Sequence, residues 1–379
     1  SVPVFELLTK TFGAFADSVV AKGAGDGGEQ AGWVSAIDAS TKWGRQTSLS
    51  APTFVFFPQA GSSPKHYAGV YSALSKRCPV DARYLFVQPP GRDAREAEAN
   101  ETDYKKVVAD ATAALKPYLI GPESKDGPTT FIGDSWGAIA AYAVAHELRE
   151  QCGWTPTHVV VSGNASPEVT STHNGLGTYS STPMADLTDG DLIDFLRESG
   201  VSEEDLGSDG AYASLLRAFR ADCQLYEDYK RPADLPLLPS KLMILLGKDD
   251  HVTKMSDALG WVDEFDTEVS KVVRVAGATH HVHEEQPEAV ADHLLDLMGI
   301  AQPKPLVLKV ERLKEVSMTL APPEAFVRGV DVEALQSFRE GNLLYRMGSA
   351  SGSKGELSSL ASMTRTRSNE WPSRMESPY

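Results

Sequence analysis

The sequence has only three cysteines, Cys78, Cys152 and Cys223, and none of them belongs to a C-x-x-C pair. A sparse, odd number of cysteines does not make a disulfide framework and is typical of proteins whose thiols stay reduced. No apolar run approaches membrane-spanning length, and the first residues show no cleavable signal-peptide pattern. We therefore expect an intracellular protein, without resolving the cytoplasm from an organelle such as the plastid.

Positive charge is also scarce, because 36 Lys and Arg residues face 52 Asp and Glu residues, giving a formal net charge of −16. This balance argues against nucleic acid or an anionic membrane as the main partner. The chain has 379 residues and a hydrophobic content of 41%. These values fit one large α/β domain with additions, or two ordinary domains.

The most informative stretch combines a strand, a sharp turn and a helix. A β-branched apolar run over 129–132 leads into Gly133-Asp-Ser135-Trp-Gly137, and an alanine-rich helix former follows over 138–148. A serine at the tip of a strained strand-to-helix turn needs small residues two positions away on either side, because larger side chains would collide with the backbone. The helix N-terminus beneath it favours developing negative charge. We therefore predict that Ser135 is a nucleophile.

Strands alternate with helices on both sides of this stretch, and each strand is a short apolar run closed by turn residues. The pattern predicts an α/β protein with a mostly parallel, doubly wound sheet and functional groups at the carboxyl ends of the strands. The expected strands are 53–57, 84–88, 129–132, 158–162, 241–246 and 271–276, and the expected helices are 66–75, 103–119, 138–148, 258–265 and 288–298.

The strand signal stops between residues 167 and 236, where two helical patterns occupy 189–199 and 212–229. Either Thr188 or Asp189 could cap the first helix. The apolar stripes are Leu192, Phe195 and Leu196 on the first helix and Leu215, Leu216, Phe219, Cys223 and Tyr226 on the second. They can pack as plain core, or they can face inward from a helical lid and line an acyl pocket, and both interpretations can hold together.

The two ends of the chain carry weaker signals. Residues 1–50 form an N-terminal extension with a helical pattern over 5–20, a Gly-rich break at 23–28 and a second short helix around 33–37. The break fits G-x-G-x-x-G, but without a clear βαβ unit a flexible linker explains it better. Residues 301–379 form a C-terminal extension. Its weak patterns could form a short strand over 306–310 and a helix over 332–338. Its Ser-, Gly- and Arg-rich tail from residue 348, about the last 30 residues, is expected to be disordered.

A serine nucleophile needs a general base, and the base needs an acidic partner that orients it. The chain offers Asp250 and His280, each four residues beyond the end of an expected strand. The order Ser, Asp, His along the chain is that of α/β-hydrolases. Two backbone N–H groups must meet the oxyanion, and we expect them from Trp136, directly after Ser135, and from Ala60, after the first core strand.

Neighbouring residues compete for these roles. Asp249 could replace Asp250, but the G-x-x-D spacing after this strand favours Asp250. Among His280, His281 and His283, the first fits best, because a Glu and then a Pro seven residues on follow it as in many hydrolases. The His-His-x-His pattern could also bind a metal, but no acidic or Cys ligand accompanies it at a recognisable spacing.

Six ordered segments together resemble the type II (discrete, editing) thioesterases of polyketide and nonribosomal peptide synthases, within the α/β-hydrolase superfamily. They are FPQAGS at 57–62, QPPGR at 88–92, GDSWG at 133–137, RADCQLYEDY at 220–229, GKDDHV at 247–252 and the segment around His280. The resemblance runs from about residue 52 to residue 300 and so defines a hydrolase domain over 51–300.

The resemblance implies an α/β-hydrolase fold with a helical lid at 167–236. It implies a substrate held as a thioester on the phosphopantetheine arm of an acyl or peptidyl carrier protein. Because a thioester is already reactive, no metal or organic cofactor is expected. The residues expected to line the pocket or lid are Gln59, Leu192, Phe195, Leu196, Phe219 and Tyr226.

The chain departs from this family in two of these motifs, at five positions in all. The family usually has His before the nucleophile and Met or Leu after it, where this chain has Asp134 and Trp136. It favours Gly-Gly-His-Phe near the catalytic histidine, where this chain has Ala-Thr-His280-His. A bulky Trp136 is expected to reshape the acyl pocket and Asp134 to alter the local field. A general carboxylesterase or acyl-CoA thioesterase, and more remotely a non-catalytic carrier-protein binder, are the alternatives.

Overall fold

We analysed the protein as a computed structural model, which describes residues 32–38, 51–78, 82–172, 182–201, 209–267 and 270–300. None of the helices within these ranges is long and apolar enough to cross a bilayer. The helical pattern at 5–20, the Gly-rich break at 23–28 and the features expected after residue 301 lie outside the described residues.

The elements follow the alternation that the sequence predicts, and each expected strand and helix of the hydrolase domain appears within a few residues of its predicted bounds. The strands are β1 (Val34–Asp38), β2 (Thr53–Phe57), β3 (Arg83–Val87), β4 (Thr129–Asp134), β5 (His158–Ser162), β6 (Lys241–Gly247) and β7 (Ser270–Val275). The α-helices are α2 (Ala68–Arg77), α3 (Tyr104–Leu119), α4 (Trp136–Cys152), α5 (Pro167–Thr172), α6 (Asp189–Glu198), α8 (Asp209–Asp228), α9 (Met255–Leu259), α10 (Val282–Glu285) and α11 (Pro287–Leu297). Short 3-10 helices are η2 (Pro64–Tyr67), η3 (Asp93–Arg95), η4 (Met184–Asp186) and η5 (Gly260–Glu264).

The seven strands form one sheet in the order β1-β3-β2-β4-β5-β6-β7, antiparallel between β1 and β3 and parallel elsewhere. The register pairs Phe57 with Gly133, Asp134 with Ser162, and Gly247 with Val275. The carboxyl ends of the parallel strands therefore meet at one edge of the sheet, where open α/β sheets place their sites. The predicted α/β-hydrolase fold is confirmed.

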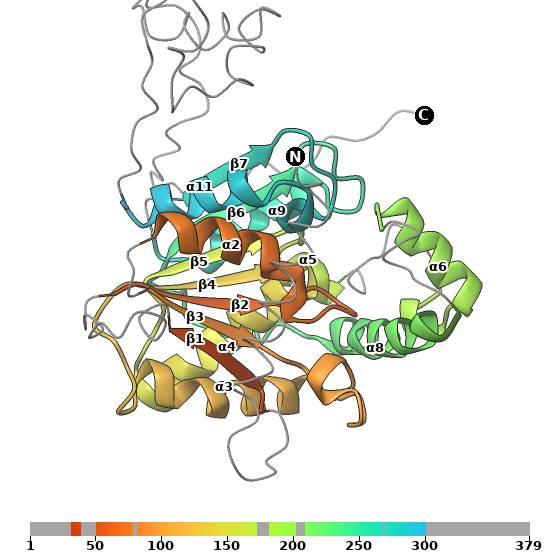
Figure 1. Cartoon of the computed structure of the whole chain (residues 1–379), viewed down its shortest axis with the longest axis horizontal. Coiled ribbons are helices and arrows are strands. Elements are labelled where there is room, and N and C mark those ends of the chain that lie inside the picture. The colour runs from red at the N-terminus through yellow and green to blue at the C-terminus, as the bar shows by residue number, and fades with distance from the viewer. Residues whose placement is uncertain are drawn as a thin grey trace, which may run out of the picture. The chain divides into compact units, whose positions relative to one another are not determined.

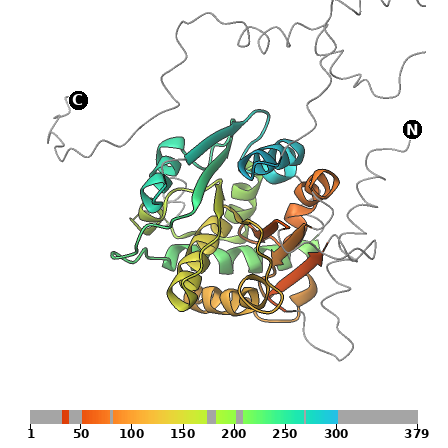
Figure 2. The same cartoon turned by 90° about the vertical axis from the view of Figure 1, so that its left-hand side faces the viewer.

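Each buried strand sends alternate side chains into two separate cores. In β2, Phe54 and Phe56 pack with α2 and α11, whereas Val55 and Phe57 pack with α3 and α4. Figures 1 and 2 show the resulting three layers, with α2 and α11 on one face of the sheet and α3 and α4 on the other. The four β2 residues are buried almost completely, so the strand reads as a continuous apolar run rather than an alternating one.

The expected short helix around residues 33–37 is wrong, because Val34–Asp38 forms the edge strand β1. Its backbone pairs with β3 over five residues, from Val34 opposite Val87 to Asp38 opposite Arg83. A five-residue segment cannot be stable as an isolated helix, and the exposed edge of β3 offers it a full set of hydrogen bonds. Pairing with a distant strand thus outweighed the local pattern.

A buried ion pair joins the segment between β5 and β6 to the sheet. Both terminal nitrogens of Arg92 donate to the carboxylate of Asp222 on α8, and the bond from Nη2 to Oδ1 measures 2.9 Å. The backbone N–H of Gly61 donates to Oδ2 of the same carboxylate at 2.7 Å, and Arg92 also reaches the carbonyl of Ser62 at 3.2 Å. The Asp222 carboxylate therefore connects three of the sequence motifs, those at 57–62, 88–92 and 220–229.

We predict that replacing Arg92 by methionine lowers the free energy of unfolding by about 3 kcal/mol, because it leaves the Asp222 carboxylate buried without its cation. Urea denaturation followed by circular dichroism measures this change. Lys106→Ala is the control: it breaks an exposed pair with Asp110 and should cost at most about 0.5 kcal/mol. Equal losses in the two variants would contradict the prediction.

Candidate active site

Ser135 occupies a strained turn between β4 and α4. Its φ of 50° and ψ of −123° lie outside the regions that residues with a side chain normally adopt. Such a conformation places the side chain at the tip of the turn, as in the nucleophile elbow of hydrolases.

The two glycines of the motif are required by close backbone approach. A Cβ atom on Gly133 would lie 2.3 Å from the carbonyl oxygen of Gly137, and one on Gly137 would lie 2.1 Å from the carbonyl oxygen of Phe57. Both distances are far below van der Waals contact, so any side chain at either position would push the turn apart. The steric reason expected from the spacing is found in the structure.

Asn164, which the sequence analysis missed, helps to hold this turn. The Ser135 N–H donates to the carbonyl of Ser162 at 2.8 Å, and the Ser135 carbonyl accepts from the side-chain amide of Asn164. The Tyr226 hydroxyl of α8 donates to the other side-chain atom of Asn164, Oδ1, at 2.6 Å. The only signal in the sequence is its place two residues after β5, at the edge where the site forms.

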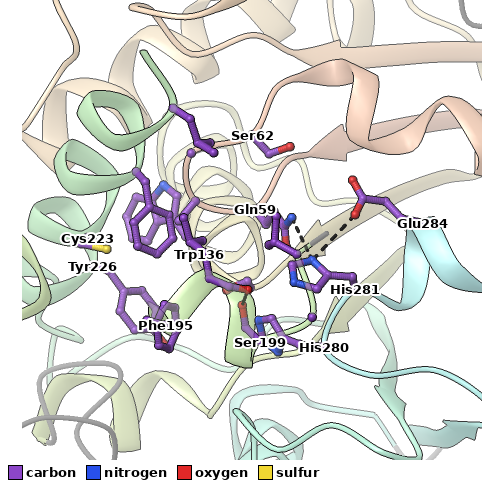
Figure 3. A pocket seen from close by; sticks show the side chains of 18 of the residues that line it. Gln59, Ser62, Trp136, Phe195, Ser199, Cys223, Tyr226, His280, His281 and Glu284 are labelled. Atoms are coloured by element: carbon purple, nitrogen blue, oxygen red, sulfur yellow. Dashed lines mark hydrogen bonds and ion pairs between the residues drawn. The ribbon is translucent and has the colours of Figure 1, made fainter. Parts of the chain in front are cut away.

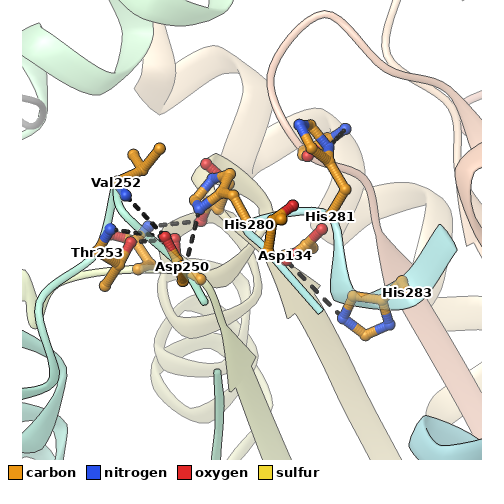
Figure 4. A network of polar contacts seen from close by, with 12 residues as sticks. Asp134, Asp250, Val252, Thr253, His280, His281 and His283 are labelled. Carbon is orange, nitrogen blue, oxygen red and sulfur yellow. Dashed lines mark hydrogen bonds and ion pairs between the residues drawn. The ribbon is translucent and has the colours of Figure 1, made fainter. Parts of the chain in front are cut away.

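Asp250 and His280 come together at the carboxyl ends of β6 and β7 (Figure 4). Oδ2 of Asp250 lies 3.1 Å from Nδ1 of His280, and Oδ1 accepts from the backbone N–H groups of Val252 at 2.8 Å and Thr253 at 2.9 Å. An ionised carboxylate can only accept, so Nδ1 of His280 carries the hydrogen and Nε2 keeps its lone pair. This is the tautomer that a general base needs.

The two groups also tune each other's protonation. Burial alone lowers the pKa of His280, but the hydrogen bond and charge of Asp250, with the charge of Asp134, outweigh it and raise the pKa above its usual value. Burial alone raises the pKa of Asp250, but the hydrogen bond and charge of His280 and the two backbone donors lower it. The pair is therefore built to stabilise a positive charge on His280.

Ser135 and His280 line one cavity of about 430 Å³. Figure 3 shows His280 in this cavity with Trp136 and Tyr226. Its apolar wall comes from α6 and α8, with Phe195, Leu196, Phe219 and Tyr226 as expected from the sequence. Leu192 does not border the cavity but lies fully buried in the apolar cluster between α6 and α8. Leu215 and Cys223, from the apolar stripe of the second helical pattern, also line the cavity. Other lining residues, which the sequence analysis did not expect there, are Gly61, Ser62, Ser199, Gly200, Val201, His281, Glu284 and Glu285.

The cavity also contains the two residues expected to bind an oxyanion, Ala60 and Trp136. Trp136 is the first residue of α4, where backbone N–H groups have no partner within the helix. Gln59 lines the cavity and shares a hydrogen bond of 3.2 Å with Nδ1 of His281. The structure thus places Ser135, His280 and the two residues expected to bind an oxyanion around one space, and Asp250 contacts His280.

The remaining histidines of the segment have other surroundings. His283 is fully buried, and burial, against the opposing charge of Asp134, lowers its pKa to about 4. His281 lies at the cavity wall, 3.7 Å from Glu284. Within the described ranges, no group of three His, Cys, Asp or Glu side chains could hold a metal ion.

The indole of Trp136 borders two cavities. On one side it lines the active-site cavity, where it packs edge to face with Tyr226 at a centroid distance of 6.0 Å. On the other side it borders a small cavity of about 20 Å³ beneath α3 and α4. The second cavity is lined by Phe57, Pro58, Val87, Pro89, Val107, Val108, Ala111, Ala140, Val144 and Asp222. A smaller residue at position 136 would therefore join the two cavities, and the added space would be lined almost entirely by apolar residues.

The sequence of this chain is similar to those of several known proteins. The family model described as Thioesterase domain matches residues 52–298. Linear gramicidin dehydrogenase LgrE of Brevibacillus parabrevis is 30% identical over 183 residues, which are 45% of this chain and 61% of that protein. Gramicidin S biosynthesis protein GrsT of Aneurinibacillus migulanus is 24% identical over 248 residues, 65% of this chain and 89% of that protein. The chain thus spans about three fifths of the length of LgrE.

Solved structures share the fold. The type II thioesterase BorB from the borrelidin biosynthetic cluster superposes with a TM-score of 0.54 at 24% identity, over 72% of this chain and 98% of BorB. The RedJ thioesterase from the prodiginine pathway of Streptomyces coelicolor superposes with a TM-score of 0.54 at 22% identity, over 69% of this chain and 93% of RedJ.

We predict that Trp136→Leu shifts the preferred acyl length upward, because the opened apolar space can bury more methylenes while the backbone N–H remains. Each buried methylene contributes about 0.8 kcal/mol, so kcat/KM for a chain two carbons longer should gain roughly tenfold relative to the preferred one. Hydrolysis of p-nitrophenyl esters from two to twelve carbons would measure this. Trp154→Leu, which removes an indole outside the cavity, is the matched control, and an unchanged preference in Trp136→Leu would contradict the prediction.

Proposed function

Because the chain belongs to the thioesterase domain family, we propose that it hydrolyses acyl thioesters held on the phosphopantetheine arm of an acyl or peptidyl carrier protein. The observation that carries this proposal is a cavity with an apolar wall that Ser135 and His280 both line, together with the contact between His280 and the Asp250 carboxylate. The relatives and the fold that they share with this chain support the same assignment.

Acylation begins with attack of the Ser135 oxygen on the thioester carbonyl. His280 takes the serine proton on Nε2, while Asp250 holds Nδ1–H and stabilises the imidazolium that forms. The backbone N–H groups of Ala60 and Trp136 stabilise the oxyanion of the tetrahedral intermediate. The C–S bond then breaks, the proton passes from His280 to the sulfur, and the free phosphopantetheine thiol leaves.

Deacylation repeats these steps with water. His280 takes a proton from water as the water oxygen attacks the acyl-enzyme carbonyl, and the proton then returns to the Ser135 oxygen as the ester bond breaks. The product is a carboxylic acid, and the serine is regenerated. A thioester is reactive enough that these groups suffice, so we propose no metal or organic cofactor for the reaction.

We propose that residues 167–236 act as a lid that binds the acyl chain. The helices α6 and α8 supply Phe195, Leu196, Phe219 and Tyr226 to the cavity wall, opposite Ser135 and His280. An apolar acyl chain transferred from water to this wall is stabilised by burial. The carrier protein would then deliver the thioester carbonyl to Ser135 with its acyl chain directed at the lid.

We also propose that the protein works inside the cell. Cys78, Cys152 and Cys223 are all free thiols, and Cys78 and Cys223 are buried. Free thiols persist where glutathione and thioredoxin keep the surroundings reducing.

We predict that Ser135→Ala lowers the release of acyl groups from acylated carrier protein at least about a thousandfold, because the covalent path is removed. The assay compares acylated carrier protein with the same acyl group on coenzyme A, for wild type and for the variant. Ser75→Ala, an exposed serine on α2, is the control and should match wild type.

Three outcomes separate the candidate functions. Strong, Ser135-dependent hydrolysis of the carrier substrate supports the proposal. Equal or faster turnover of coenzyme A thioesters or simple esters would replace it with a general acyl-CoA thioesterase or carboxylesterase. No Ser135-dependent turnover of any of these substrates would overturn the nucleophile and favour a non-catalytic carrier-protein binder.

A further inference from the structure

A chain of charged groups leads from the buried Asp134, next to Ser135, through the buried His66 to the half-exposed Glu284. His66 on η2 is fully buried between two carboxylates: its Nε2 lies 2.7 Å from Oδ2 of Asp134, and its Nδ1 lies 2.9 Å from Oε1 of Glu284. Both ring nitrogens face oxygens that only accept, so both must carry hydrogens and the ring must be an imidazolium. Burial alone lowers the pKa of His66, but the two carboxylates raise it to about 10.

Asp134, directly before the nucleophile, is held in its ionised form by this chain. Burial alone raises its pKa, but the charge that His283 carries at acid pH, and the hydrogen bond and charge of His66, bring it well below its usual range. His283 has a pKa of about 4 and is neutral at pH 7, so His66 supplies the positive charge beside Asp134 at that pH. Asp134, at the position where the family usually has His, therefore places a negative charge next to the turn that carries Ser135.

The second oxygen of this carboxylate faces the catalytic histidine. Oδ1 of Asp134 is buried and has no hydrogen-bond partner among the described residues, and it lies 3.8 Å from Nε2 of His283. Gly163 separates it from His280: a Cβ at Gly163 would lie 3.4 Å from this oxygen and 3.1 Å from Cε1 of the His280 ring. Figure 4 shows the Asp134 carboxylate beside His280, on the side away from Asp250.

Several elements bring charged or titratable groups to this place. The pKa of His280 is shifted by Asp250 after β6, Asp134 on β4 and His66 on η2. The pKa of Asp134 is shifted by His66, His280 and His283, and Tyr67 lies close to Asp134. Glu284, on α10, acts on His66 and His281. The charges of the buried pair Asp134 and His66 cancel, and the half-exposed Glu284 leaves one net negative charge over the three residues.

We propose that Asp134 is a positioning residue that stabilises the positive charge of His280 during catalysis, as a second carboxylate opposite Asp250, and that His66 keeps it ionised. The proposal rests on the proposed function only in taking His280 as the base of Ser135. When His280 accepts the serine proton, its ring becomes positive between two carboxylates. The unpartnered Oδ1, shielded from water, stabilises that charge without any movement.

The test is the pH dependence of Ser135 reactivity, measured as the rate at which a fluorophosphonate probe labels the protein. The probe needs a base-activated serine but no thioester, so it reports on His280 independently of the natural substrate. In wild type the rate rises with pH as His280 loses its proton. Asp134→Asn removes a negative charge beside the ring, so the midpoint should move to lower pH by about one unit. The plateau rate should fall about tenfold, since one pKa unit corresponds to a factor of ten.

Glu284→Gln is the matched control, because it removes the same charge from the far side of His66 and leaves the contact between His66 and Asp134 in place. Its midpoint should move by less than half as much. A merely structural role for Asp134 would lower the amount of folded protein but leave the midpoint of the folded fraction at the wild-type pH. That result, or a shift to higher pH, would overturn the proposal.

If Asp134→Asn does not fold, the double variant Asp134→Asn with His66→Gln restores a neutral hydrogen bond between the two side chains. It removes the carboxylate together with the opposing charge of His66, so a smaller shift in the same direction is expected, and an unmoved midpoint would overturn the proposal. Labelling of wild type without thioester hydrolysis would sink the proposed function alone. A wild type that the probe does not label would overturn both.

Discussion

The carboxylate of Asp222 is the point on which the shape of the active-site cavity depends. It receives two donors from Arg92, after β3, and the backbone N–H of Gly61, after β2, while itself standing on α8. Gly61 lies directly against Phe219, because a Cβ at Gly61 would lie 3.0 Å from the Cβ of Phe219, so the ion pair fixes where the loop that carries Ala60 meets the apolar wall of α8. Because both charges are buried, moving either segment away would leave the charge on the other segment unpaired in an apolar environment. The cavity therefore has a rigid corner next to the helices that we propose as a lid.

The parts of this protein that could be predicted are those with a local cause. The elbow at Ser135 follows from two glycines whose missing side chains leave room for the backbone of Gly137 and Phe57. Asp250 and His280 could be chosen because each follows a strand whose apolar run is plain in the sequence. Parallel strands end at a common edge, so residues 115 or more positions from the nucleophile were expected beside it.

What could not be predicted depends on partners far away in the chain. Val34–Asp38 becomes a strand only because β3 offers an open edge, and its five residues alone do not distinguish a helix from a strand. The sequence marked Asp134 as unusual but did not reveal His66, 68 positions earlier, or Glu284, which completes the chain of charges. Asn164 carries no motif at all. Pairings of this kind are set by the packed fold, since the residues of each pair lie on separate elements.

Asn164 contacts both the turn at Ser135 and the helix α8, so the conformation of the turn and the position of the helix are coupled. One end of its side chain holds the strained carbonyl of Ser135, and the other accepts from the hydroxyl of Tyr226 on α8. A displacement of α8 that breaks the second bond frees the amide that supports the first. Linkage makes this coupling reciprocal: a ligand that stabilises the seated α8 also favours the strained turn, and by the same coupling free energy the turn favours the seated α8. Ser135 would in this way be more reactive when the pocket is occupied than when it is empty.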